Sequence, residues 1–599
     1  MQCRICERGC HITEGKQGAC HHYSKQGGEI REIYPNRYLQ VGPIFIETMP
    51  MLHFYPGGRF LQVTTTGCNF NCQGCISAVI VQQMDPASAA LITLTADEII
   101  DEALKQDCIG ITFVLNDPLA SFYTFLELAC RAKKKGLLVG CSSNAYFTEE
   151  SLEKLLPYLD FINIGMKGIS DSAYQACGAS SAVPVLRNLN KIYEHGVHVE
   201  VSCMFRCDNR EEVLVLSKYI GAISRHIPFQ LMRFIPFGDA DPDLEPSIQE
   251  AEELCKELRA NLDYVYLFNS AGSEDINSYC PGCGELIALR DFYGPMGAIN
   301  REPGMISILT RENQCPGCGR PFIFTGQAFA PEDEEDSSFT GGYPFTRSLE
   351  MMEAILICMG VQDKNKVLQV WEKMLQKDSI LPPHKFFQDL DSYIAIISWF
   401  GIIVAEEAKA EKLAAYMQEK IDLIRTHLEG VKERPGVYYA MGKPLFCIKG
   451  ERLENQLVEV AGGISINREL TNEGRPGRRV AVEQINRLNP QYIFTSTFTA
   501  SSLDEFYAEC LRVGMDVEAV AKRRIFAHPA PGWDFGSPRW ILGLMNIANI
   551  LHPEIFHFDI EEEARYFYQE FYGLDFNVRE INRSFSHPHR YWHWNDNKA

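Results

Sequence analysis

Short apolar and β-branched runs alternate with amphipathic polar segments along the first half of the chain. Six runs have the length of strands, namely "FLQVTTT", "GITFVL", "GLLVGCSSN", "FINIGM", "HVEVSCMF" and "FQLMRFIPF". Segments such as "ADEIIDEALKQD" and "TEESLEKLLPYL" separate them and have helical periodicity. This alternation predicts an α/β fold with a parallel sheet and outer helices, here a partial α/β barrel. Ligands of such sheets bind at the carboxyl ends of the strands.

The pattern changes after Gly326. The acidic stretch "QAFAPEDEEDSSFTGG" has the composition of a linker. Helical segments follow, among them a long candidate helix from Val404 to Lys432, and strands then alternate with helices again. We therefore expect the following domains: a Cys-rich segment at 1–48, the partial barrel at 49–270, a paired CPGC knuckle at 271–326, the linker at 327–342, a second α/β domain at 343–580 and a His/aromatic tail at 581–599.

Length and composition indicate a soluble globular protein. A chain of 599 residues exceeds the size of a single core, and its 46% apolar and 23% charged residues are ordinary values. The formal charge of -21 argues against nucleic acid as a partner. The N-terminus has neither the basic nor the apolar region of a secretory signal, and the longest apolar run, Ile394 to Ala405, is too short to span a membrane. We expect a cytoplasmic protein without a membrane partner.

The cysteines are concentrated in three places, and in a reducing compartment such groups bind metal more often than they form disulfides. Four lie near the N-terminus, three in "GCNFNCQGC", and four in two "CPGCG" knuckles. The other ten are expected to be small buried hydrophobes. They are Cys108, Cys130, Cys141, Cys177, Cys203, Cys207, Cys255, Cys358, Cys447 and Cys510.

The two accessory cysteine sets each predict a metal site, and the identity of the metal is better defined for the knuckles than for the N-terminal set. The knuckles offer Cys280, Cys283, Cys315 and Cys318, and four thiolates in a closed tetrahedron suit structural zinc or a rubredoxin-like iron, with an iron-sulfur cluster as the rival. The N-terminal set is Cys3, Cys6, Cys10 and Cys20. Its spacing suits zinc or an accessory 4Fe-4S cluster, and the residues alone do not separate the two.

The set Cys68, Cys72 and Cys75 has an odd number of thiols. A C-x3-C-x2-C loop can hold three corners of a 4Fe-4S cubane and leave the fourth iron open for a small chelating molecule. The spacing resembles the radical S-adenosylmethionine (SAM) motif. In that superfamily the amino and carboxylate groups of SAM occupy the open iron, and one electron cleaves SAM to a 5'-deoxyadenosyl radical.

Further segments extend this resemblance from Met1 to about Gly326. They are "EGKQGAC", "PMLHFYPGG", "VLNDP", "CSSNAYFTEESLEKL", "LDFINIGMKG", "HVEVSCMF", "MRFIPFG", "LDYVYLFN" and the paired knuckles. Together they resemble the radical SAM enzymes related to pyruvate formate-lyase activating enzyme, in the branch called AmmeMemoRadiSam. The resemblance implies a partial (β/α)6 barrel, with a Cys-rich N-terminal element and a zinc-ribbon-like element.

The resemblance also implies roles for polar residues. Asn116 and Asp117 match the acidic motif that holds the SAM amino group, and Ser143 and Asn144 match a position that reaches its ribose or carboxylate. Lys167 matches the lysine of a "DLK" pattern and is expected in the catalytic site, and Arg233 matches an arginine of the sixth strand. The alternative for each is a cap or turn bond.

The chain departs from the family pattern around the adenosine and substrate region. Gly74 replaces an aromatic residue, Gly165 replaces the aspartate of "DLK", "SNA" stands for "TNG", and Gln230 replaces a histidine. The three cluster thiols are unaffected.

From about Tyr343 to Tyr572 the chain resembles a class III periplasmic binding protein, of the type that captures metal chelates, haem, siderophores or cobalamin. The motifs are the long helix, "NQLVEVAGG", "EQINRLNPQYIF" and "GSPRWILGLMNIANILHPEIF". The part before the helix is short for a complete first lobe, so the domain is expected to be reduced. Trp533, Phe535, Arg539 and Trp540 could bind a flat or anionic ligand, or belong to the core.

The C-terminal tail concentrates His587, His589 and His593 among aromatic residues. An arm packed on the protein is the expectation, with metal binding as the alternative.

These features together predict a radical SAM enzyme of an anaerobic setting that takes electrons from a donor such as flavodoxin or ferredoxin and acts on an unidentified small molecule or protein. Two alternatives stay open. One is an activase that makes a glycyl radical on a protein partner. The other is a non-catalytic protein that binds iron-sulfur clusters, corrinoids or metal chelates.

Overall fold

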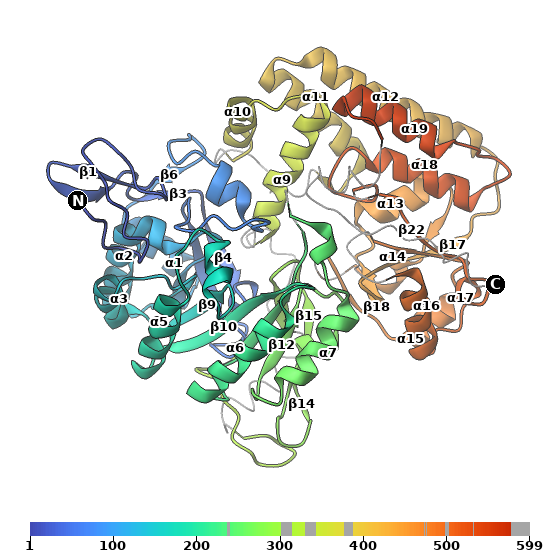
Figure 1. Ribbon diagram of the computed structural model, residues 1–599. Coiled ribbons are helices and arrows are strands. Elements are labelled where there is room, and N and C mark those ends of the chain that lie inside the picture. Colours follow the sequence, from blue (N-terminus) through green and yellow to red (C-terminus); the bar gives the residue numbers. More distant parts are fainter. Residues whose placement is uncertain are drawn as a thin grey trace. The chain divides into compact units, whose positions relative to one another are not determined.

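A computed structural model describes residues 1–236, 240–300, 314–329, 343–375, 387–472, 474, 476–496, 502–530 and 532–576 (Figure 1). The chain divides into two compact units. The first comprises Met1–Phe234, Glu250–Asn269 and Glu274–Thr346, and the second comprises Ile235–Gln249, Ser270–Ser273 and Arg347–Ala599. The expected linker, from residue 330 onward, and the C-terminal tail with its three histidines lie outside the described residues.

The first unit is built on an eight-stranded sheet in the order β12-β11-β10-β9-β8-β7-β5-β4. Its strands are β4 (Gln40–Phe45), β5 (Arg59–Thr64), β7 (Gly110–Phe113), β8 (Leu138–Ser143), β9 (Phe161–Met166), β10 (His198–Phe205), β11 (Phe229–Arg233) and β12 (Val265–Phe268). β4 pairs antiparallel with β5, and every other pair in this sheet is parallel. The predicted parallel sheet is thereby confirmed, and all six predicted runs contain a strand.

Helices connect successive strands and pack on the sheet (Figure 1). They are α1 (Ala96–Lys105), α2 (Phe122–Lys134), α3 (Glu149–Leu155), α4 (Asp171–Gln175), α5 (Val183–Glu194), α6 (Arg210–Ile223) and α7 (Ile248–Leu258). The start of α1 shows why the sequence folds this way. The Thr95 hydroxyl accepts a hydrogen bond from the backbone N–H of Glu98, and the Glu98 carboxylate accepts one from the N–H of Thr95, which forms a capping box.

The two faces of the sheet differ in polarity because strand side chains alternate. In β10, Val199, Val201 and Cys203 join the apolar core, whereas Glu200 and Ser202 lie on the opposite face and are also buried. The Glu200 carboxylate accepts hydrogen bonds from the backbone N–H groups of Leu52 (2.9 Å) and His53 (2.8 Å), and from Gln230. This inner face is therefore a hydrogen-bonded polar interior, closed in part by the segment before β5.

Short antiparallel pairs complete the first unit. They are β1 (Tyr23–Gln26) with β2 (Glu29–Glu32), β3 (Arg37–Tyr38) with β6 (Ile92–Thr93), β13 (Ser278–Tyr279) with β14 (Leu286–Ala288), and β15 (Arg290–Phe292) with β16 (Ala298–Asn300).

The second unit contains a mixed sheet in the order β20-β18-β17-β21-β22, with β19 paired to β17. The strands are β17 (Gly436–Met441), β18 (Lys443–Ile448), β19 (Ile464–Ser465), β20 (Gly477–Arg479), β21 (Tyr492–Thr495) and β22 (Ile525–Ala527). β17, β21 and β22 run parallel, and β18 is antiparallel to β17 and β20. The predicted α/β character of this half is confirmed at this level.

Helices make up the rest of the second unit. They are α9 (Tyr343–Cys358), α10 (Lys364–Leu375), α11 (Leu390–Val404), α12 (Glu407–His427), α13 (Leu453–Val460), α14 (Asn467–Leu470), α15 (Val482–Leu488), α16 (Leu503–Arg512), α17 (Glu518–Ala521), α18 (Trp540–Leu551) and α19 (Ile560–Phe567). Within the part of the chain that the structure describes, no helix is long and apolar enough to cross a membrane.

The long helix differs from its predicted bounds. The sequence predicts one helix from Val404 to Lys432, but α11 ends at Val404 and α12 begins at Glu407. Ala405 has a left-handed backbone conformation (φ 55°) and its N–H bonds back to Gly401 and Ile402. Periodicity could not reveal this break because alanine ordinarily favours helix. The apolar run Ile394 to Ala405 belongs to α11 except for its last residue.

We predict that Glu200→Ala destabilises the first unit. The substitution leaves several buried donors without an acceptor, at a cost of about 3 kcal/mol in the free energy of unfolding. Denaturant titration followed by circular dichroism measures the shift. The matched control is Glu194→Ala, an exposed carboxylate at the end of α5, for which a change within about 0.5 kcal/mol is expected. Equal midpoints for the two variants would show that the Glu200 network does not stabilise the fold.

Candidate metal centres

The loop after β5 carries Cys68, Cys72 and Cys75, and a neighbouring side chain fixes its start. The Asn116 amide accepts a hydrogen bond from the Thr65 N–H (3.1 Å), and donates to the Thr65 hydroxyl (2.8 Å) and the Thr66 carbonyl (3.2 Å). Gly67 has φ +81°, and a Cβ there would lie 2.2 Å from Nε2 of His22. Asn116 therefore holds the cysteine loop, which is a different use of its amide from the predicted contact with SAM.

The three thiols of this loop are half-buried. The Cys68 sulfur accepts a hydrogen bond from the Phe70 N–H at 3.3 Å, and the Asn144 amide nitrogen lies 3.7 Å from it. A hydrogen bond with Cys177 lowers the pKa of Cys72 to about 6 and raises that of Cys177.

Cys177 is a residue that the sequence analysis placed among the scattered hydrophobes. It follows α4, and its carbonyl accepts a hydrogen bond from Asn71 at 2.9 Å. The structure therefore brings a fourth thiol to the loop. No motif spacing could have identified it, because the contact joins segments about a hundred residues apart.

Lys167, just after β9, faces the thiols. Burial works against the charged ammonium, but the neighbouring Cys72, Cys177 and Cys75 raise the pKa of Lys167. A cation in this position stabilises thiolates and a cluster that they hold. At Gly165 a Cβ would meet nothing closer than the Ser143 carbonyl at 3.9 Å and the Lys167 ammonium at 4.0 Å. A Cβ there would make only ordinary van der Waals contacts, so the glycine leaves Lys167 without the carboxylate neighbour of the family pattern.

Asp117, Ser143 and Asn144 form one buried cluster after β7 and β8. The Asp117 carboxylate accepts hydrogen bonds from the N–H groups of Leu119 (2.9 Å) and Asn144 (2.7 Å), and from the Ser143 hydroxyl (3.2 Å). Burial raises the pKa of Asp117, and these hydrogen bonds act in the opposite direction. The predicted site residues of β5, β7, β8 and β9 therefore all lie at the carboxyl ends of parallel strands, where ligands of such sheets bind.

Arg233, at the end of β11, is fully buried. Its Nε donates to the Asn269 carbonyl at 2.9 Å, and the Asn269 amide donates to the Arg233 carbonyl at 2.9 Å. These bonds join the ends of β11 and β12. Its predicted contact with SAM stays a prediction.

The two knuckles bring their thiols into one compact group. All four sulfurs lie within 4.8 Å of one another, with Cys280 3.6 Å from Cys318 and Cys283 3.5 Å from Cys315. The backbones repeat, since the N–H of Gly284 bonds to the Cys280 carbonyl and that of Gly319 to the Cys315 carbonyl. Such a closed set could hold a metal ion and has the ligands that structural zinc takes.

The N-terminal cysteines also meet, since Cys3, Cys6, Cys10 and Cys20 line one cavity of the first unit. Cys3 and Cys6 are buried, and Cys10 and Cys20 are partly exposed. Their sulfurs do not form a compact group like that of the knuckles, among the residues that the structure describes.

In the second unit, the residues expected to offer a ligand surface are mostly core. Trp533, Arg539 and Trp540 are buried, and the Trp540 ring packs edge-on against Tyr393 at 5.7 Å. Phe535 is partly exposed, but the Arg452 guanidinium lies over its ring at 4.5 Å. The core alternative therefore describes these residues better.

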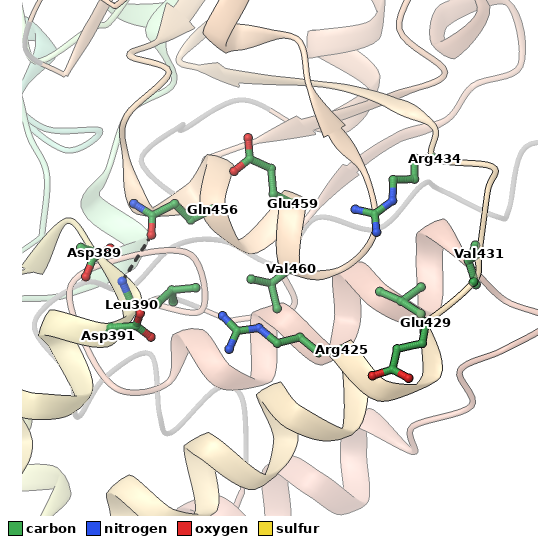
Figure 2. A pocket seen from close by; sticks show the side chains of 12 residues that line it. Asp389, Leu390, Asp391, Arg425, Glu429, Val431, Arg434, Gln456, Glu459 and Val460 are labelled. Atoms are coloured by element: carbon green, nitrogen blue, oxygen red, sulfur yellow. Dashed lines mark hydrogen bonds between the residues drawn. The ribbon is translucent and has the colours of Figure 1, made fainter.

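A separate cavity of about 550 Å³ lies in the second unit between the start of α11, the end of α12 and α13 (Figure 2). Charged side chains of both signs surround it, including Arg425, Arg434 and Glu459. The N–H of Leu390 donates to the Gln456 side chain at 3.3 Å at one end of the cavity. Its volume is typical of sites for small ligands.

Known proteins resemble parts of the chain. Residues 63–220 match the Radical SAM superfamily, so the chain carries a radical SAM domain. An uncharacterized protein of Methanocaldococcus jannaschii is 28% identical over 325 residues, which are 53% of this chain and 94% of that protein.

Among solved structures, a periplasmic solute binding protein of Veillonella parvula is similar with a TM-score of 0.30 and 20% identity, over 33% of this chain and 61% of that one. An ABC transporter solute binding protein of Sulfurospirillum deleyianum is similar with a TM-score of 0.28 and 25% identity, over the same shares. The chain thus spans about six tenths of the length of these solved structures.

The residues of the loop fit the 4Fe-4S cluster and SAM that a radical SAM domain implies. Cys68, Cys72 and Cys75 supply the thiolates, a backbone N–H and an amide approach the Cys68 sulfur, and the Lys167 cation offsets the negative charge.

We predict that the knuckles bind about one zinc ion per chain and that Cys283→Ala abolishes its binding, because a four-thiolate site loses a ligand. Elemental analysis of the purified protein measures the metal. The control is Cys207→Ala, which removes an exposed thiol outside the three cysteine sets. Iron in place of zinc at the knuckles, or zinc that persists in the Cys283 variant, would contradict the assignment.

Proposed function

We propose that this chain is a radical SAM enzyme that cleaves SAM reductively and abstracts hydrogen from a substrate. The match of residues 63–220 to the superfamily carries the proposal, and the position of the three thiols after β5 supports it. When bound, the cluster supplies the electron that cleaves SAM to methionine and a 5'-deoxyadenosyl radical.

The protein's own residues would prepare this reaction. Asn116 fixes the start of the cysteine loop, and Lys167 places a positive charge beside the thiols. Asp117 is the carboxylate that we propose to orient the SAM amino group, since an ammonium would compensate its buried charge. Asn144 connects Asp117 with the cysteine loop, because its backbone N–H donates to the Asp117 carboxylate and its side chain approaches the Cys68 sulfur.

The finer assignment rests on the sequence. The ordered motifs favour the AmmeMemoRadiSam branch related to pyruvate formate-lyase activating enzyme, and a one-electron donor such as flavodoxin or ferredoxin is the proposed partner. Gly165 supports a substrate unlike those of relatives with an aspartate there, because it removes a carboxylate from beside Lys167. We propose that the protein acts in the cytoplasm without a nucleic acid or membrane partner.

The second unit is proposed to bind a ligand or partner of the enzyme. The cavity near α11, α12 and α13 is the proposed place, because its arginine and carboxylate side chains would suit a polar small molecule. The buried Trp533 and Trp540 do not support the loop at 533–540 as a binding surface.

The test of the proposed function is the formation of 5'-deoxyadenosine. The full chain is reconstituted anaerobically with iron and sulfide, reduced and mixed with SAM, and the products are separated by chromatography. We expect 5'-deoxyadenosine from the unaltered protein and its loss in Cys68→Ala, since the cluster loses one of its three ligands.

The matched control is Cys108→Ala, which removes a buried thiol after α1 outside the three cysteine sets and should leave product formation intact. Two results would contradict the proposed SAM cleavage. One is as much 5'-deoxyadenosine from Cys68→Ala as from the unaltered protein, and the other is no product from the unaltered protein with a reduced cluster. The second result would favour a protein that binds clusters without catalysis.

A further inference from the structure

The first twenty residues fold around their own cysteines. The N–H of Cys3 donates to the Cys10 carbonyl at 2.8 Å, and the N–H of Ile12 donates to the Met1 carbonyl at 2.8 Å. These bonds fold residues 1–12 back on themselves, and Cys20 lines the same cavity as Cys3, Cys6 and Cys10. The segment also pairs with the main sheet's loops, since Cys6 forms a β-bridge with Phe147.

Each of these thiols receives a backbone N–H. The N–H groups of Ile5, Arg8 and His22 bond to the sulfurs two residues before them, and the Ala19 N–H donates to the Cys10 sulfur at 3.5 Å. The same spacing of two residues recurs in the other two cysteine sets, at Cys68 and Cys280. Such bonds stabilise sulfur that carries negative charge, as it does when it ligates metal.

The spread of the sulfurs distinguishes the metal. Four thiolates around zinc, each about 2.3 Å from the ion, lie within about 4 Å of one another. The knuckle sulfurs have this spacing, but within the described ranges no three sulfurs of the N-terminal set all lie within 4.8 Å of one another. A 4Fe-4S cluster is larger than a single ion and holds its thiolates further apart. The spacing of the N-terminal sulfurs therefore suits a cluster better than a single zinc ion.

A neighbouring side chain supports the same conclusion. Asn69 lines the cavity and is only 2% exposed. Its Oδ1 accepts a hydrogen bond from Asn144 at 2.7 Å, but its Nδ2 has no hydrogen-bond partner among the described residues. A buried donor without an acceptor is costly and points to a missing group. The Oδ1 of the same side chain also lies 3.7 Å from the Cys68 sulfur, so the sulfides of a cluster at either cysteine set would supply that acceptor.

We propose that Cys3, Cys6, Cys10 and Cys20 bind a second 4Fe-4S cluster. Four thiolates occupy all four irons, so this cluster has no open position for SAM and is suited to carrying an electron rather than to cleaving a substrate. The existence of the cluster does not depend on the proposed function.

Its position indicates its role, and this part of the inference rests on the proposed function. Asn69 lines the N-terminal cavity and directly follows Cys68 in the chain, and the Arg8 side chain donates to the Asn69 carbonyl at 2.6 Å. One electron from a low-potential donor of the flavodoxin or ferredoxin class would reduce the N-terminal cluster. The same electron would then pass to the cluster at Cys68, which returns the N-terminal cluster to its oxidised state.

The test uses the full chain, reconstituted anaerobically with iron and sulfide, and two sets of substitutions. One protein carries Cys68→Ala, Cys72→Ala and Cys75→Ala, and the other carries Cys6→Ala and Cys20→Ala. Cys255→Ala, a buried thiol of α7, is the matched control. Iron, sulfide and zinc are measured per chain, and the reduced proteins are studied by electron paramagnetic resonance with and without SAM. Zinc at the knuckles reports that the first unit has folded.

We expect about eight irons in the unaltered and control proteins and about four in each variant, because each loses one cluster. The remaining signal should not respond to SAM in the triple variant and should respond in the double variant. If the triple variant contains no iron, or an additional zinc, the N-terminal site is not a cluster. If the folded double variant keeps all the iron, these cysteines are not its ligands.

The same proteins separate the two proposals. A SAM-independent cluster in the triple variant supports the second site even if the unaltered protein makes no 5'-deoxyadenosine. For the relay, reduced flavodoxin replaces the chemical reductant. With this donor we expect the SAM-responsive signal to be lost in the double variant and retained in Cys255→Ala. If the signal appears at equal rates in the two proteins, the N-terminal cluster does not pass electrons to the cluster at Cys68, although the proposal that the N-terminal cluster exists would stand.

Discussion

Thiolate groups in a buried environment set the main physical constraint on the first unit. Burial raises the pKa of Cys6 to about 12 and of Cys20 to about 11, so these thiols resist ionisation without a partner. Metal ligation requires the thiolate form. The chain meets this requirement with backbone N–H groups at the N-terminal sulfurs and at Cys68 and, in the loop after β5, with the ammonium of Lys167.

The parallel sheet turns this local requirement into a site. β5, β7, β8 and β9 end at the same edge, so residues from Cys68 to Lys167 meet there although they are distant in sequence. The inner face of the sheet is polar, and the Glu200 network is satisfied by Leu52, His53 and Gln230. Polar groups are tolerated in this interior because nearly every one has a hydrogen-bond partner.

The sequence predicted the parts of this structure that depend on local periodicity and spacing. Six of the eight strands in the main sheet of the first unit and the compact knuckle thiols follow from patterns a few residues long. Contacts between distant segments were not predictable in this way. Tertiary packing places Cys177 beside Cys72 and leaves the Asn69 amide nitrogen without a partner among the described residues. It also decides that Asn116 holds the cysteine loop. In the second unit, burial decides that Trp533 and Trp540 belong to the core.

The central claim is that Cys68, Cys72 and Cys75 hold a cluster with one open iron for SAM. Electron-nuclear double resonance of the reduced protein, with SAM labelled with nitrogen-15 at its amino group, tests it most directly. A cluster with an open iron that binds SAM predicts a hyperfine coupling between the label and the cluster. A reduced cluster signal without such a coupling, at saturating SAM, would contradict the account.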